Sequence, residues 1–313
     1  MSAAPAAPGA AGPPVAPGGG PPDHVAPTRP PLGPPAAAGA PTARPRPRHP
    51  RSALVAAGVL ALLVAVAALA PVVAPHAPEA LDLADRRAAP STAHWFGTDE
   101  LGRDLLTRVL FGARVSLAIG LVSAGVSAAI GVVVGATAGY AGRWAEALLM
   151  RLTDAMLSVP RLPLLMIAAA VLDPGVPLLV LLVGAVGWME TARVVRAEVQ
   201  SLRARDHVAA ARALGAPPTR VLARHVLPGV APTAAVATAL AVGRGILLES
   251  ALSFFGVGVQ PPTASWGSML YQAQATMSTE PWLGLFPGAF VFLTVLCCNV
   301  LGDALAAARP GAE

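Results

Sequence analysis

The sequence predicts an all-α membrane protein with about six transmembrane helices, on three observations. First, the chain of 313 residues is 55% hydrophobic and only 12% charged. Second, its apolar residues gather in separate runs, and about 20 residues suffice for a helix to cross the hydrocarbon core of a bilayer. Third, arginines collect in polar segments between these runs, as they do in loops on the cytoplasmic side of a membrane.

The first 52 residues are rich in Pro, Ala and Gly and poor in large apolar side chains. Such a segment buries too little surface to offset its chain entropy, so we expect a disordered tail. Arginines between residues 44 and 51 precede the first apolar run, residues 53–74, and predict that the tail is cytoplasmic. A cleavable signal peptide is the alternative, but the long tail and the over-long run argue against it. The polar segment that follows, up to residue 112, would then lie outside the cytoplasm.

Further apolar runs complete the predicted spans. They comprise residues 115–140, 144–172, 178–188, 230–254 and 286–301. Gly131, Gly135 and Gly139 recur every four residues in the first of these runs, which predicts a helix face that packs closely against a neighbour. The even number of spans places both termini in the cytoplasm and predicts a multi-pass protein of the cytoplasmic membrane.

The third span is interrupted by Pro160, Arg161 and Pro163. Irregular backbone survives at membrane depth only where protein or water satisfies its polar groups. A proline-broken helix that carries a charge is therefore typical of a transport pathway.

Four charged residues in the predicted spans are candidates for lining such a pathway: Asp154, Arg161, Arg244 and Glu249. A charge at this depth costs about 2.5–3.5 kcal/mol on insertion scales, so each should be paired or face water. Arg244 and Glu249 are five residues apart, a poor fit to one helix face, so we expect pairing across helices. The alternatives are structural. Asp154 would lie near the membrane interface, with Arg161 snorkelling or paired to it, and Glu249 would form an interhelical bond.

The polar segment 203–228 predicts two cytoplasmic helices joined by a turn. Residues 206–214 are rich in alanine, and Gly215 supplies the permissive backbone that ends the first helix. Two adjacent prolines then fit the first turn of a second helix, where no amide donor is needed, and Pro228 is expected to end it.

An apolar stripe on the second helix is expected to seat in the groove of a partner protein. The stripe consists of Val221, Leu222, His225 and Val226. The alternative is that the arginines of this segment mark the cytoplasmic side and do nothing more.

The external segment contains the run HWFGTDELGRD, residues 94–104. Asp99 and Arg103 are four residues apart, as are Asp104 and Arg108. An amphipathic interfacial helix with two ion pairs therefore accounts for the run.

The composition argues against several other functions. All the basic residues are arginines, whereas a P-loop needs a lysine on the terminal phosphates, so another chain must hydrolyse any ATP. The arginines lie beside apolar spans and are not interleaved with aromatic residues, which disfavours nucleic-acid binding. Cys297 and Cys298 are adjacent in an apolar run and are interpreted as small hydrophobic residues. The six histidines lie in polar segments, which argues against an intramembrane enzyme. The predicted pathway has few charges and no cluster of His or Cys ligands, so we expect no metal site on this chain.

Three separated runs resemble one protein family. The run 94–104 and the run LSFFGVGVQPPTASWG, residues 252–267, resemble segments of the C-type permease subunits of dipeptide, oligopeptide and nickel importers. The third run, in segment 203–228, resembles the loop motif of binding-protein-dependent ABC importers. Its matching residues are Ala210, Ala211, Gly215, Leu227 and Pro228.

The loop departs from that motif at two positions. Ala209 stands where the motif has Glu, and His225 stands where it has Ile. The missing carboxylate removes the basis for a salt bridge from that position, for which Asp206 is only a partial substitute. The helix, turn and helix do not depend on it.

The resemblance covers residues 53–309 and implies the type I ABC importer permease fold. It implies a permease subunit that moves short peptides, nickel chelates or similar small polar solutes across a bacterial cytoplasmic membrane. Its partners would be a second, homologous permease in a heterodimer, two ATP-hydrolysing subunits and an extracytoplasmic solute-binding protein. ATP and Mg²⁺ would lie on the partner subunits, so no cofactor and no catalytic residue are expected on this chain.

The same resemblance implies the layout of the chain. The expected parts are a tail (1–52), a first helix with an external segment (53–112), the permease domain (113–309) and a second tail (310–313). The coupling residues, within 205–228, would be Asp206, Ala210, Ala211, Arg212, Gly215, Arg220, Leu222, Leu227 and Pro228. A stand-alone channel or secondary transporter is the alternative, but that class does not need two helices in this register.

Overall fold

The computed structural model describes residue 12, residues 50–172 and residues 175–308. The described residues from 50 onward belong to one compact unit, residues 47–313. In this unit the described residues form helices joined by loops, as predicted. The disordered tail predicted for residues 1–52 lies outside the described residues, apart from residue 12 and the start of the first helix.

Among the described residues, five helices are each long and apolar enough to cross a membrane. They are α1 (Pro50–Ala68), α3 (Leu105–Ala141), α6 (Val176–Arg203), α9 (Leu227–Phe254) and α11 (Trp282–Ala307). A sixth span exists if α4 (Arg143–Ser158) and α5 (Arg161–Leu172) count as one, since these two are bent by 81°. The bend falls at the predicted break, because Pro160 lacks the amide donor that a continuous helix needs.

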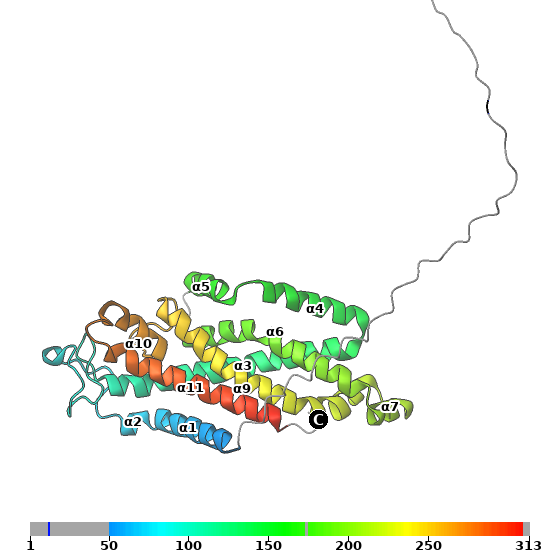
Figure 1. The fold of residues 1–313 in the computed structure, drawn as a ribbon, viewed down its shortest axis with the longest axis horizontal. Coiled ribbons are helices and arrows are strands. Elements are labelled where there is room, and N and C mark those ends of the chain that lie inside the picture. Colours follow the sequence, from blue (N-terminus) through cyan, green and yellow to red (C-terminus); the bar gives the residue numbers. More distant parts are fainter. Residues whose placement is uncertain (1–11, 13–49, 173–174, 309–313) are drawn as a thin grey trace, which may run out of the picture. The chain divides into compact units, whose positions relative to one another are not determined.

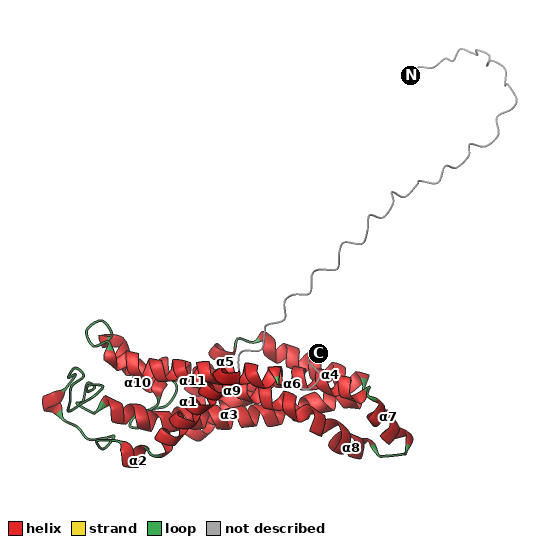
Figure 2. Ribbon diagram, turned by 60° about the horizontal axis from the view of Figure 1, so that its bottom comes forward, coloured by secondary structure: helices red, strands yellow, loops and turns green. Residues whose placement is uncertain are grey.

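The remaining helices are short and lie at the two ends of the long ones. They are α2 (Ala70–Val73), α7 (Asp206–Ala213), α8 (Pro218–Val221), α10 (Trp266–Ala273), a π-helical turn (Leu222–Val226) and two 3₁₀ turns (Leu83–Asp85 and Gln274–Thr276). Figures 1 and 2 show α7 and α8 at one end, and α10 with the loops near α2 at the other. The polar loops of the chain are thereby separated by the length of the spans.

Helix α3 is central to the packing, because it lies along both α6 and α9, while α11 packs against α9 and α1 (Figure 1). The contact with α6 is close. A Cβ atom added at Gly135 would lie 2.5 Å from the carbonyl oxygen of Ala192 and 2.8 Å from Cβ of Val195. Cβ atoms added at Gly131 and Gly139 would also meet side chains of α6. The predicted small-residue face is confirmed, and its neighbour belongs to the same chain.

Helix α3 begins at Leu105, earlier than the predicted start at residue 115. Asp104 caps it, because one carboxylate oxygen accepts a hydrogen bond from the amide of Thr107 at 2.8 Å. Such a cap satisfies an amide that has no partner inside the first turn. The polar residues of this first turn are buried against the rest of the protein, which their sequence pattern does not reveal.

The interfacial helix predicted over residues 94–104 is wrong, because this segment is a loop. One predicted ion pair forms, between Arg103 Nε and Asp99 Oδ2 at 2.7 Å. The second does not form, because Asp104 caps α3 while Arg108 instead lies 3.4 Å from Asp99. Asp99 and Arg103, four residues apart, therefore pair across a turn rather than along a helix.

Gly102 explains why the segment cannot be helical. Its φ of +74° lies in the left-handed region, and a Cβ atom there would lie 1.7 Å from the carbonyl oxygen of Asp82. Only glycine permits such a crossing of two backbones. The tight crossing joins the loop before α3 to the segment after α2.

Candidate functional site

The first candidate site is the segment 203–228, which connects α6 to α9. Helix α7 ends as predicted at Gly215, whose φ is +80°. The amide of Ala216 donates to the carbonyl of Ala211 at 3.2 Å, and the amide of Gly215 donates to that of Arg212 at 2.9 Å. This pair of bonds is a Schellman motif, which needs a left-handed residue at the position of Gly215.

The second helix of the segment does not end at Pro228, which corrects the prediction. Helix α8 runs through the π-helical turn Leu222–Val226 directly into α9. The amide of Leu227 donates to the carbonyl of Leu222, five residues back. This wider turn precedes Pro228, whose ring would otherwise crowd the carbonyl four residues earlier, so the helix continues.

The apolar stripe predicted to seat in a partner is instead used inside the chain. Val221 and Val226 are completely buried, together with Val208 of α7. They pack in a cluster with residues of α6 and the start of α9. The expectation for these two valines is wrong, because the nearest apolar groove belongs to the chain itself. The loop is consequently anchored to the spans.

The remaining predicted residues of the loop differ in their exposure. Asp206, Ala210, Arg212, Arg220 and Pro228 are exposed, whereas Leu222 and Leu227 are half-buried and Ala211 is buried. Their coupling role stays a prediction.

Leu214 was missed by the sequence analysis. Its side chain is 88% exposed at the turn after α7. The signal was present in the sequence, because a leucine directly before the helix-ending glycine has no helical face of its own to pack on.

The second candidate site is a set of charged residues in the spans. Glu190 of α6 lies between Arg161 of α5, at 2.8 Å, and Arg244 of α9. These side chains are between 22% and 41% exposed. The structure thus brings two of the predicted pathway residues, Arg161 and Arg244, together through Glu190, which is not among the predicted pathway residues.

Asp154 does not pair with Arg161, which corrects one structural alternative. Its partner is Arg193 of α6, at 2.5 Å, and both side chains are about half-exposed. One turn away, Arg196 pairs with Glu146 of α4. Helix α6 therefore presents its charges to α4 and α5, the two halves of the bent pair.

Glu249 lies apart from these pairs and is 1% exposed. It accepts hydrogen bonds from Ser116 of α3 at 2.9 Å and from Ser253 at 2.8 Å. Both hydroxyls also accept a hydrogen bond from a backbone amide: Ser116 from that of Trp266, and Ser253 from that of Val259. This geometry favours the interhelical alternative, while a pathway role for Glu249 stays a prediction.

Replacing Glu249 by alanine is expected to lower stability by about 2–4 kcal/mol, because two buried hydroxyls lose their acceptor and a cavity forms. Glu249→Gln keeps the shape and an acceptor, so it should cost less than about 1 kcal/mol. Thermal unfolding of the purified chain in detergent compares the two. A Glu249→Gln variant of normal stability that no longer transports would contradict this structural role and assign Glu249 to the pathway.

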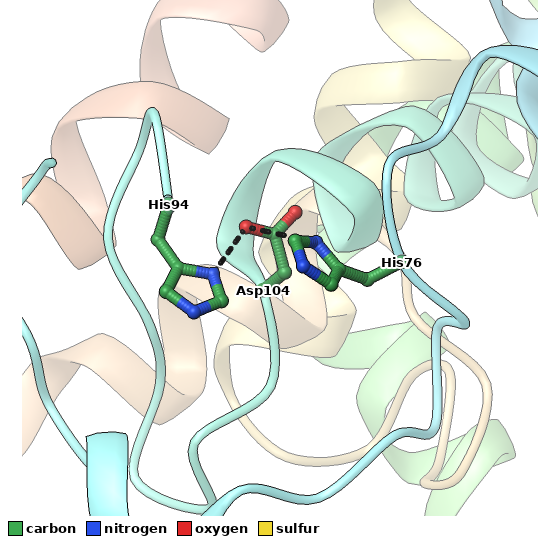
Figure 3. Close-up of side chains that lie close together, drawn as sticks. All are labelled: His76, His94 and Asp104. Carbon is green, nitrogen blue, oxygen red and sulfur yellow. Dashed lines mark hydrogen bonds and ion pairs between the residues drawn. The ribbon is translucent and has the colours of Figure 1, made fainter. Parts of the chain in front are cut away.

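One group of side chains has the residue types that ligate metals, although the sequence indicates no metal site. His76, His94 and Asp104 meet at the end of the molecule where α3 begins, with all three ligand atoms within 4.8 Å of one another (Figure 3). His76 comes from the segment after α2, whereas His94 and Asp104 come from the loop that leads into α3, so no local spacing in the sequence indicates the group.

Comparison with known proteins agrees with this architecture. Residues 131–308 match the family described as the inner membrane component of binding-protein-dependent transport systems. Residues 45–90 match the N-terminal transmembrane domain of oligopeptide transport permease C. Between them, these two matches leave residues 91–130 uncovered, which comprise the loop before α3 and the larger part of α3 itself.

Individual relatives extend the match across that gap. A putative peptide permease of Brucella suis is 39% identical over 233 residues, which are 74% of this chain and 77% of that protein. A dipeptide transport system permease of Bacillus subtilis is 35% identical over 248 residues, 79% of this chain and 78% of that protein. A glutathione transport system permease of Pectobacterium atrosepticum is 38% identical over 253 residues, 80% of this chain and 84% of that protein. The chain therefore belongs to the family of inner membrane components of binding-protein-dependent transport systems.

Proposed function

We propose that this chain is one permease subunit of an ATP-driven importer of short peptides. A second, homologous permease completes the pathway, two ATPase subunits bind the segment 203–228, and an external binding protein delivers the solute. Both termini lie in the cytoplasm in this arrangement. Nickel chelates and other small polar solutes are the alternative cargo, because the external binding protein makes most of the selection.

The observation that carries this proposal is the anchored loop with an exposed apolar tip. Because Val208, Val221 and Val226 are buried among residues of the spans, the loop cannot move independently of α6 and α9. Leu214 and the arginines around it face outward. ATP can shift the equilibrium between two arrangements of the spans only by the difference in its affinity for them. A rigid loop transmits that difference to the spans.

The charged group at Glu190 supports a polar cargo. Two arginines share one carboxylate, so the group Arg161, Glu190 and Arg244 keeps one unbalanced positive charge. Partly exposed charges at mid-span are stable only beside water or a polar partner. A peptide carries a terminal carboxylate that such a group attracts, which favours peptides over neutral solutes.

The test of this function is co-purification of the tagged chain from detergent-solubilised membranes, followed by ATPase and uptake assays in proteoliposomes. The proposal expects an ATPase and a second permease in the complex, with uptake of di- to pentapeptides that requires ATP. Recovery of the chain alone, with solute flux that survives ATP removal, would instead assign it to channels or secondary transporters.

Leu214→Asp is expected to weaken ATPase binding by roughly 30-fold, because an anchor at the centre of an interface typically contributes about 2 kcal/mol. Leu305→Asp is the matched control, since Leu305 is also an exposed leucine but lies at the end of α11. Titration of the purified ATPase against each variant measures the change. Equal affinities for the two variants would exclude Leu214 from the interface.

A further inference from the structure

We propose that His76, His94 and Asp104 form a binding site for a divalent cation of the zinc type, at the end of the molecule opposite the segment 203–228. Figure 3 shows both imidazole rings directed at the Asp104 carboxylate. His94 Nδ1 lies 2.9 Å and His76 Nδ1 lies 3.8 Å from the same oxygen, Oδ1. The proposal does not depend on the transport function.

The donor set suits zinc. Two imidazole nitrogens with one carboxylate oxygen are ligands that Zn²⁺ takes in proteins, at bonds of about 2.0–2.2 Å. Tetrahedral bonds of that length place ligand atoms roughly 3.3–3.5 Å apart. The two distances to Asp104 Oδ1, 2.9 and 3.8 Å, lie on either side of this value, and all three ligand atoms lie within 4.8 Å of one another. Side-chain rotations, chiefly of the exposed His76, would therefore bring the three atoms into position.

Neighbouring groups can hold the ligands in the orientation that a metal needs. The second nitrogen of His94, Nε2, lies 4.0 Å from Asp85 Oδ2, an ion-pair distance that the exposed Asp85 side chain can close to a hydrogen bond. A carboxylate on the far nitrogen of a ligating histidine keeps the proton there and leaves the near nitrogen free for the metal. The other Asp104 oxygen, Oδ2, is already held by the amide of Thr107. Asp104 therefore offers Oδ1 without losing its cap on α3.

Burial is graded across the site. The side chain of Asp104 is 2% exposed, that of His94 is 12% exposed and that of His76 is 40% exposed. The carboxylate thus lies at the closed base and His76 at the open rim. Three protein ligands leave a fourth tetrahedral position, which on this geometry is on the solvent side and is available to water or to a ligand atom of another molecule.

A metal here would join parts of the chain that are far apart in sequence. His76 follows α2, His94 lies in the loop before α3, and Asp104 is the cap of α3 itself. The ion would therefore fasten the long segment between the first two spans to the helix that packs along α6 and α9.

The test is titration of Zn²⁺ into the full-length chain, purified without a histidine tag in detergent and competed with a chromophoric chelator. We expect one Zn²⁺ per chain. His76→Asn should weaken binding by more than 100-fold, and Asp85→Asn, which removes only the outer partner, by about 10–100-fold. Both positions are well exposed, so the variants should fold as the wild type does.

Two controls match these variants. Glu79→Gln removes a nearby exposed carboxylate, and His207→Asn removes an exposed histidine at the other end of the molecule. Neither should change the affinity. Replacing Zn²⁺ by Co²⁺ should produce the intense visible bands of a four-coordinate site, and these should be lost in His76→Asn. Wild-type protein that does not bind Zn²⁺ at 100 µM or about that concentration, or that binds it no better than His76→Asn, would overturn the proposal.

Discussion

Gly135→Ala is expected to destabilise the chain by about 1–3 kcal/mol, although alanine is the better helix former. The added Cβ atom would lie 2.5 Å from the carbonyl oxygen of Ala192, and a backbone oxygen cannot rotate away as a flexible side chain does. Helix α3 must then separate from α6, which opens the packing along both helices. Thermal unfolding and the monodisperse yield in detergent measure the loss.

Gly125→Ala is the control for this substitution, because Gly125 lies in the same helix and a Cβ atom there meets nothing within 4 Å. It should be neutral or stabilise the chain by up to about 1 kcal/mol. If both variants unfold at the same temperature, the close contact between α3 and α6 does not exist.

Gly215→Val is expected to leave the complex assembled but to uncouple ATP hydrolysis from uptake. The φ of +80° disfavours any residue with a Cβ atom by about 1–2 kcal/mol, and a branched one more. A Cβ atom at this position meets nothing within 4 Å, so the effect arises from the backbone alone. The turn is then expected to change shape, which displaces Leu214 and breaks the Schellman bonds.

Gly215→Asn is the matched variant, because asparagine is the non-glycine residue that most readily takes this conformation at the end of a helix. It should keep most of the coupled transport. The measurement is the ratio of solute imported to ATP hydrolysed in proteoliposomes, with the loaded binding protein outside. A normal ratio in Gly215→Val would refute the coupling role of this turn.

Much of the architecture was predictable, because the thickness of a bilayer sets the length of an apolar run and the geometry of a helix sets where it bends or ends. The lengths of the apolar runs predicted the spans, the prolines around Arg161 predicted the bend between α4 and α5, and three spaced glycines predicted a close helix contact. Gly215 predicted the end of α7, because a left-handed residue at a helix end is a local requirement.

The failures share a cause, which is that local patterns do not reveal the partner of a side chain. Asp104 and Arg108 have the spacing of an ion pair, yet Asp104 caps a helix and contacts His94, ten residues earlier in the chain. Val221 and Val226 have the spacing of a docking face, yet they are buried in their own chain. Pro228 predicts the end of a helix, yet the π-helical turn before it lets the helix continue.

Features that depend on neighbours along the chain can be predicted from the order of residues: an all-α membrane protein, its spans, its broken helix and the turn at Gly215. Which charges and ligands meet depends on how the helices pack. Glu190 joins Arg161 to Arg244, Glu249 joins α3 to α9, and His76 joins His94 at Asp104. The physical reason is that a buried charge or ligand must find its partner in space, and the fold brings together residues whose separation in sequence carries no periodic signal.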